Sequence, residues 1–214
     1  MDYYINSQGL ASPCVKEYEV DTTVDLHKGT VMTLSNGKAK KAGASDKILG
    51  ILCEHYSVKK EELNPRSGSG RVRVNVSSGA VFRQPNLFTV LTAAGTATKI
   101  TVAGFTVPTT ADAFKGGYLR LVSKAADSEN TDTVGTLRAV SASSGSELTV
   151  SSGGAAAVGD VYEILLPAGF SYLTLNSDAD GYTLASSTSS KVRVVGCDPY
   201  YTFTELHFAD HYFA

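Results

Sequence analysis

Hydrophobic and polar residues alternate along many short segments of this chain, and a helical period is almost absent. In the segment 71–76, Val72, Val74 and Val76 alternate with charged or polar residues. This period of two is typical of a strand with one buried face. Clusters of Gly, Ser, Asn and Asp separate such segments and favour turns between them. The pattern therefore predicts an all-β fold with very little helix.

The other predicted strands are short and rich in β-branched or aromatic residues, and they cover residues 31–34, 48–52, 81–82, 88–91, 99–102, 118–122, 136–140, 148–150, 161–166, 172–175, 182–184 and 191–195. Strands at this spacing are typical of β-sandwiches and barrels. Asn36-Gly37 predicts a tight hairpin turn, because both residues accept a positive φ. Gly50 indicates a bulge or a close approach of two backbones. Only residues 57–63 and 112–114 resemble short helices, the first with Ser57 as its cap.

Breaks in the pattern divide the chain into an extended arm and two small β modules of the barrel or sandwich kind. Residues 1–13 are expected to form the N-terminal arm, which ends at Pro13. The first module covers residues 15–104, and the segment 104–116 is the junction to a second module over residues 105–168. The C-terminal β segment, residues 169–214, either follows the second module or returns to complete the first.

Composition indicates a globular protein with no general affinity for nucleic acid. Of the 214 residues, 43% are hydrophobic and 19% are charged, and the net charge is −2, so any basic surface must be local. Cys14, Cys53 and Cys197 lie far apart in sequence, which favours buried thiols in a reducing compartment. The start of the chain lacks the pattern of a signal peptide, and no apolar run has the length of a membrane span. We therefore expect neither a membrane nor a nucleic acid as a partner.

A search for catalytic chemistry gives no strong motif. The sequence lacks G-x-S-x-G, a Walker loop, G-x-G-x-x-G and H-E-x-x-H, so we expect no enzyme, no catalytic residue and no cofactor. His207 and His211 would share one face of a helix and could there bind zinc. In a strand they lie ~13 Å apart, too far for one metal ion. We interpret them as partly buried side chains at the chain end.

Two acidic segments leave alternatives open. Residues 176–181, NSDADG, match the first half of a calcium-binding loop, but Ser187 stands where the bidentate Glu is needed. A hairpin turn through Asp180-Gly181, between the strands 172–175 and 182–184, is the preferred interpretation. Residues 126–132 carry three carboxylates, which we interpret as a solvated loop. A pair of glycosidase carboxylates in this loop stays open, because sequence does not give their separation.

Three groups of residues are candidates for binding a partner. Lys38, Lys40 and Lys41 follow the Asn-Gly turn and either protect a sheet edge or contact an acidic surface. The last fifteen residues are rich in aromatic side chains, which serve either as core or as a docking strip. The candidates in this strip are Phe208, Tyr212 and Phe213. The arm carries Asp2, Tyr3, Tyr4 and Ile5 and has no obvious partner strand in the sequence.

Three longer segments are similar to proteins of phage heads. LHKGTVMTLSNGKAKKAGASDKILGIL, residues 26–52, and RVRVNVSSGAVFR, residues 71–83, resemble the G-x-V-hydrophobic, Asn-Gly, LGIL and V-V-x-G layout of tailed-phage head decoration proteins. Residues 114–167, FKGGYLRLV to GDVYEILLP, resemble a small β module that recurs in phage head structural proteins. The span of residues 26–83, which contains the first two segments, and residues 114–167 together cover a little over half of the chain.

The resemblance implies a structural rather than an enzymatic role. Such proteins bind the outside of an expanded icosahedral shell and cement neighbouring capsid subunits, often as trimers, and in several an N-terminal arm lies against the capsid protein. Only Asp2–Ile5 and the following residues to Pro13 correspond to such an arm here. We therefore expect a homotrimer on the capsid exterior, assembled in the host cytoplasm, with the major capsid protein as partner. The alternative is an adhesive module of the virion surface whose loops, residues 123–135 or 141–157, bind host glycans.

Overall fold

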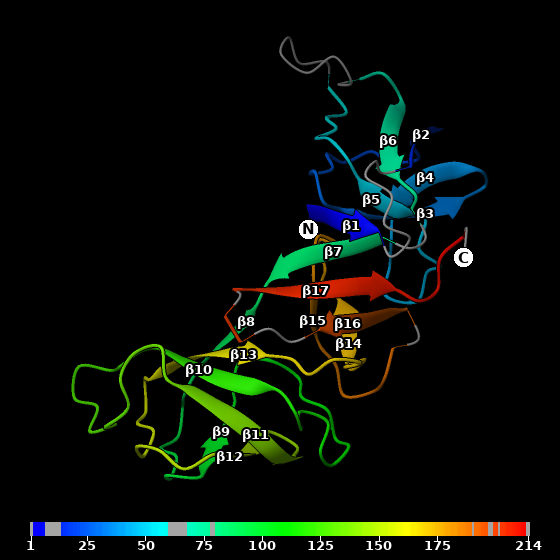
Figure 1. The fold of residues 1–214 in the computed structure, drawn as a ribbon. Coiled ribbons are helices and arrows are strands. Elements are labelled where there is room, and N and C mark those ends of the chain that lie inside the picture. The colour runs from blue at the N-terminus through cyan, green and yellow to red at the C-terminus, as the bar shows by residue number, and fades with distance from the viewer. Residues whose placement is uncertain are drawn as a thin grey trace.

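The structure is a computed structural model that describes residues 2–6, 14–59, 68–77, 80–189, 191–196, 199–200 and 202–212, with residues 2–6 described by their backbone. Every pair of named strands is antiparallel, and no helix occurs within these ranges. The predicted all-β class is thus confirmed. Three layers lie one beneath another in Figure 1: a barrel-like sheet at the top, a central sheet, and a second barrel-like sheet below.

The first layer, which we call the N-terminal barrel, is a curled five-stranded sheet. Its strands, in spatial order, are β2 (Val15–Glu19), β6 (Arg71–Asn75), β5 (Gly50–Leu52), β3 (Val31–Ser35) and β4 (Lys38–Lys41). The sheet curls because Val20, after β2, bridges Ala39 in β4. Asn36 and Gly37 have φ values of 50° and 79°, as the predicted β3–β4 turn requires. Inside the barrel, Met32, Val72 and Val74 are fully buried.

The lowest layer, which we call the second barrel, is a curled six-stranded sheet. Its strands, in spatial order, are β8 (Leu87–Val90), β13 (Val161–Leu165), β10 (Tyr118–Ser123), β11 (Leu137–Ser144), β12 (Glu147–Val150) and β9 (Lys99–Thr101). The Thr89 hydroxyl donates to the carbonyl of Ala103 at 3.0 Å and accepts from its N–H at 2.8 Å. This contact joins β8 to the segment after β9 and so brings the two ends of the sheet together.

The central sheet combines the two ends of the chain with a strand from its middle. In spatial order it contains β1 (Asp2–Asn6), β7 (Ala80–Pro85), β17 (Phe203–Phe208) and β16 (Val192–Gly196). A separate hairpin of β14 (Leu173–Leu175) and β15 (Tyr182–Leu184) packs beside it. Of the two predicted arrangements of the C-terminal segment, the structure has the return, because β17 pairs along β7.

Strand pairing differs from the local pattern in two places. The predicted module boundary near residue 104 cuts across the second barrel, because β8 and β9 precede it yet pair with β13 and β12. The predicted short helix at residues 112–114 is wrong: these residues form a turn in which Asp112 has a φ of 60° and its N–H donates to the carbonyl of Ser143 at 2.8 Å. The described residues of the predicted helix 57–63, residues 57–59, are not helical, and residues 60–63 lie outside the described residues.

One hydrophobic core runs through all three layers. It includes Ile48 and Ile51 from the N-terminal barrel, Phe82 from the central sheet, and Leu119 and Tyr162 from the second barrel. Buried apolar area of this extent is the main source of folding free energy. A second, smaller cluster fills the N-terminal barrel alone. The shared core fixes the layers relative to one another.

A buried polar junction also joins the second barrel to the central sheet. Glu163 of β13, only 2% exposed, accepts hydrogen bonds from the Asn86 amide at 2.9 Å and from Arg120 Nε at 2.6 Å. Asn86 in turn accepts from the Thr204 hydroxyl of β17 at 2.7 Å. Because each buried group has a partner, the junction avoids the cost of an unsatisfied polar group.

Gly50 confirms the close backbone approach expected from the sequence. A Cβ at this position would lie 1.9 Å from the carbonyl oxygen of Asn75 in the neighbouring strand β6. We expect Gly50→Ala to lower the free energy of unfolding by about 2–4 kcal/mol, because backbone must move to relieve the clash. Urea denaturation of the full chain measures this change.

Gly196→Ala in β16 is the matched control, since no atom lies within 4 Å of the position of its added Cβ. It should change the free energy of unfolding by less than about 1 kcal/mol. Equal stabilities of the two variants would contradict the close approach at Gly50.

Candidate functional site

The N-terminal arm forms an edge strand of the central sheet. β1 pairs with β7 so that Asp2 lies opposite Arg83, Tyr3 opposite Phe82 and Ile5 opposite Val81, with an irregularity around Tyr4. Its other edge has no partner strand among the described residues. No partner strand for this arm is obvious from the sequence, whereas in the structure it pairs with β7, nearly eighty residues further along the chain. The remainder of the predicted arm, residues 7–13, lies outside the described residues.

Two of the three candidate lysines contact other parts of the same chain. Lys38 Nζ lies 3.7 Å from Glu19 Oε2, where β4 meets the end of β2. Both side chains are exposed, so this ion pair contributes little stability. Lys41 Nζ donates to the carbonyl of Ser177 at 3.1 Å, at the tip of the β14–β15 hairpin. Lys40 is half-buried and forms no hydrogen bond or ion pair with the described residues.

The three aromatic candidates at the C-terminal end have different environments. Phe208 is 1% exposed, and its ring centroid lies 4.9 Å from that of Phe82, so it is a core residue and not part of a docking strip. Tyr212 is 37% exposed, and its hydroxyl lies 3.4 Å from the carbonyl oxygen of Leu34. Phe213 lies outside the described residues. Of these three candidates, Tyr212 alone is both described and exposed; Tyr200, in the same C-terminal segment, is 83% exposed.

The fold brings Tyr212 to the lysine-bearing hairpin β3–β4. The Tyr212 N–H donates to the carbonyl of Ile48 at 2.9 Å, and Lys47 Nζ lies 5.4 Å from the centroid of the Tyr212 ring. The Thr33 hydroxyl donates to the carbonyl of Lys47 at 2.7 Å, and Thr33 is the register partner of Lys40. Lys40, Lys47 and Tyr212 are therefore neighbours, and we call them the basic–aromatic patch.

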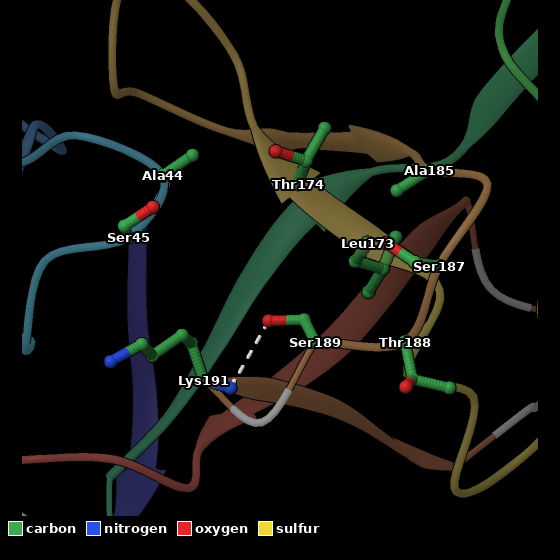
Figure 2. A pocket seen from close by; sticks show the side chains of 9 residues that line it. All are labelled: Ala44, Ser45, Leu173, Thr174, Ala185, Ser187, Thr188, Ser189 and Lys191. Carbon is green, nitrogen blue, oxygen red and sulfur yellow. Dashed lines mark hydrogen bonds between the residues drawn. The ribbon is translucent and has the colours of Figure 1, made fainter.

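Figure 2 shows a groove between the loop after β4 and the β14–β15 hairpin, with a volume of about 340 Å³. Its lining is mostly hydroxyl-bearing and small: Ala44, Ser45, Leu173, Thr174, Ala185, Ser187, Thr188, Ser189 and Lys191. Lys191 Nζ forms an ion pair with Asp210, and this hydrogen bond holds the pKa of Asp210 below its ordinary value. The charge of Lys191 in this groove is thus neutralised by Asp210. The other lining residues offer hydroxyl groups for hydrogen bonds, and none of them is an acid, a base or an activated nucleophile.

The segment 176–181 joins β14 to β15, so the predicted hairpin is confirmed, but the turn differs: the positive φ, 55°, is at Ala179 and not at Asp180 or Gly181. The Asn176 amide donates to Asp180 Oδ1 at 2.8 Å, and the Asn176 N–H donates to the carbonyl of Gly181 at 2.9 Å. Ala179 is fully buried at the tip, and its carbonyl accepts from the N–H of Val31 in the N-terminal barrel at 2.5 Å. These polar groups hold the turn together and dock it on β3. Among the described residues, no group of three or more His, Cys, Asp or Glu side chains could hold a metal ion.

The acidic loop 126–132 is only partly solvated. Asp127 and Glu129 are exposed, as expected. Asp132 instead accepts a hydrogen bond from Nε of Arg138, which is 1% exposed, at 2.7 Å. Its other oxygen accepts from the N–H of Gly154 at 2.8 Å. Asp132 and Arg138 thus hold this loop against the segment after β12, and the local sequence did not indicate that the loop is held in this way.

Asp160 anchors the same end of the second barrel. Burial alone would raise the pKa of this fully buried carboxyl, but hydrogen bonds from the Ala157 N–H, the Asn130 amide and the Ala125 N–H outweigh burial and lower the pKa. The Asn130 amide also donates to the Tyr162 hydroxyl at 2.9 Å. Asp160 is thus an ionised structural group that fixes the loops 124–130 and 157–160.

Of the terminal histidines, His207 is partly buried, as predicted, whereas His211 is fully buried, and two other histidines lie side by side. His207 lies in β17, and His211, 2% exposed, bridges Ile48. His27 and His55 lie with ring centroids 5.2 Å apart, a contact that sequence reasoning missed. The two histidines are twenty-eight residues apart and match no sequence motif, so only the pairing of their segments in the structure reveals the contact.

Comparison with known proteins gives no relative for this arrangement. No family model, no curated protein and no solved structure matches the chain. In the described part of the chain, no helix is long and apolar enough to cross a membrane.

His211 should make stability depend on pH. Burial lowers its pKa from the ordinary 6.5 to about 4, and the nearby charges of His207 and Lys47 act in the same direction. In the unfolded chain, this imidazole is protonated below about pH 6.5, whereas in the folded chain it is protonated only below about pH 4. The free energy of unfolding therefore falls as the pH drops from about 6.5 to about 4. We expect a loss of about 2–4 kcal/mol from this residue across the window.

His211→Met removes the titrating group and should flatten the fall in unfolding free energy between about pH 7 and pH 4. His27→Gln, at an exposed position, is the control and should keep the pH dependence of the wild type. Urea denaturation at several pH values compares the three proteins. Identical pH profiles for wild type and His211→Met would contradict the buried neutral imidazole.

Proposed function

We propose that this chain is a virion structural protein that binds the outer surface of a tailed-phage capsid and cements neighbouring capsid subunits. The observation that carries the proposal is the edge position of β1. This N-terminal strand pairs with β7 on one side, and no described strand pairs with its other side. A strand edge presents backbone N–H and C=O groups to which another chain can add a strand. The resemblance of residues 26–52, 71–83 and 114–167 to phage head proteins supports the same conclusion.

The basic–aromatic patch supports contact with an acidic protein surface. Lys47 lies near the Tyr212 ring, and Lys40 lies opposite Thr33, whose hydroxyl bonds to the backbone of Lys47. The whole chain has a net charge of −2, so this positive charge is local and does not imply affinity for nucleic acid. Charged groups at an interface rim set register and association rate, whereas an exposed tyrosine supplies apolar contact area.

The shared core suits a protein whose role is to hold several contact surfaces at fixed positions relative to one another. Its three layers are joined by apolar packing and by the junction of Glu163 with Asn86, so contacts at one layer are held in a fixed relation to contacts at another. Many copies on a lattice gain strength from simultaneous weak contacts. We propose a homotrimer that contacts several capsid subunits through β1 and the basic–aromatic patch.

Binding to purified expanded phage heads tests the proposal. The wild-type chain should co-sediment with heads and raise the temperature at which they break open. Lys40→Glu should weaken binding about three- to tenfold, the effect of roughly 1 kcal/mol at an interface rim. Lys115→Glu, at an exposed turn of the second barrel, is the matched control and should bind as the wild type does.

A second variant lacks residues 1–6 and should lose most of its binding to heads, because the backbone edge of β1 is gone. Its melting temperature, measured in parallel, shows whether the remaining chain is folded. A wild-type chain that does not bind heads, or a folded variant without residues 1–6 that binds unchanged, would contradict the proposal.

A second candidate function is recognition of a host glycan by the loops of the second barrel. The pairs Asp132–Arg138 and Asn130–Asp160 hold these loops in one arrangement, which reduces the entropy lost on binding. Val134 is 62% exposed at the surface of this loop cluster. Binding of a defined glycan on an array, abolished by Val134→Asp, together with no binding to heads, would favour this function over the first.

A further inference from the structure

His27 and His55 occupy facing positions on two short antiparallel segments of the N-terminal barrel. Leu26 and Tyr56 exchange two backbone hydrogen bonds of 2.8 Å, which fixes the register of these segments. The next pair along such a ladder is the close, non-hydrogen-bonded kind, with Cβ atoms about 4.5–5.5 Å apart. Leu26 and Tyr56 are buried in the barrel. Because side chains alternate along a strand, His27 and His55 point to the opposite, outer face.

The separation of the two rings fits coordination of one metal ion. In a tetrahedral site with metal–nitrogen bonds of about 2.0–2.1 Å, the centroids of two coordinating imidazoles lie roughly 5 Å apart. The centroids of His27 and His55 are 5.2 Å apart, with their ring planes inclined by 34°.

The surroundings of the pair favour a cation. His27 is exposed and His55 is half-buried, so an ion can reach the rings from solvent. Asp25 precedes His27 by two residues and shares its side of the segment. Its carboxylate accepts a hydrogen bond from the Val58 N–H at 2.8 Å. This bond links the segment of Asp25 to that of Val58, so a carboxylate lies at the two segments that carry the rings.

We propose that His27 and His55 chelate one divalent transition-metal ion of the class that prefers imidazole, namely Ni²⁺, Cu²⁺ or Zn²⁺. Within the described residues no third His, Cys, Asp or Glu completes a metal-binding group. Water therefore occupies the other coordination positions, and the site is exchangeable rather than structural. Asp25 acts on the ion through its charge while its hydrogen bond to Val58 holds it in place. This site shares no residue with β1 or the basic–aromatic patch.

Titration calorimetry of the full, chelator-treated chain with Ni²⁺ near neutral pH tests the proposal. The wild type should bind one ion, and His27→Asn or His55→Asn should each lower the affinity at least about tenfold, because a single imidazole loses the chelate advantage. His207→Asn is the matched control, since it removes a histidine of β17, and should bind as the wild type does. Cys14→Ser should also leave binding unchanged, which separates the imidazole pair from the exposed thiol.

Electron paramagnetic resonance of the Cu²⁺-loaded chain provides a second measurement and should show two equatorial imidazole nitrogens in the wild type and one in His27→Asn. Melting temperatures without metal verify that the exposed-site variants remain folded. Unchanged Ni²⁺ affinity in both His27→Asn and His55→Asn would overturn the proposal. So would a wild type that binds no Ni²⁺ while both variants melt at a lower temperature, because the pair would then serve only as a ring contact.

Discussion

Pairing between β7 and β17 is the interaction on which the rest of this molecule depends. It joins residues 80–85 to residues 203–208, so the middle of the chain and its end form the centre of one sheet. The contact between Phe82 and Phe208 buries both rings at this point. β1 then adds to the free side of β7, and β16 adds to the free side of β17. Without this pair, neither the edge strand β1 nor the position of Tyr212 beside Lys47 would exist.

The two barrels are held to this sheet by contacts of different kinds. The N-terminal barrel is joined through apolar packing and through single backbone contacts, such as Val31 to Ala179 and Ile48 to His211. The second barrel is joined through apolar packing and the buried network of Asn86, Glu163 and Thr204. Buried hydrogen bonds are directional, so this network selects one orientation of the barrel as well as stabilising it.

Buried polar groups that hold the fold together and exposed groups that can contact a partner lie in different parts of the molecule. Buried charges such as Arg138 and Asp160 are used to order loops, and their partners are all within the second barrel. The exposed charges of the basic–aromatic patch, the edge of β1 and the pair His27–His55 lie instead on the N-terminal barrel and the central sheet. For the proposed role on a capsid, such division keeps the scaffold rigid while the surface exchanges contacts. The His27–His55 pair is a further surface feature, and the strand pairing and core packing of the fold do not depend on it.

The sequence by itself determined the short-range features of this protein. The period of two gave the all-β class, Asn36-Gly37 gave the β3–β4 turn, and the segment 176–181 indicated a hairpin, because alternation and turn conformation depend on residues only a few positions apart. Gly50 likewise indicated a close approach. Only the tertiary structure decided the partner of β1, the burial of Phe208, the position of the module boundary, and the meeting of His27 with His55. These depend on contacts between residues distant in sequence, whose free energies are summed over the whole core and leave no local signature.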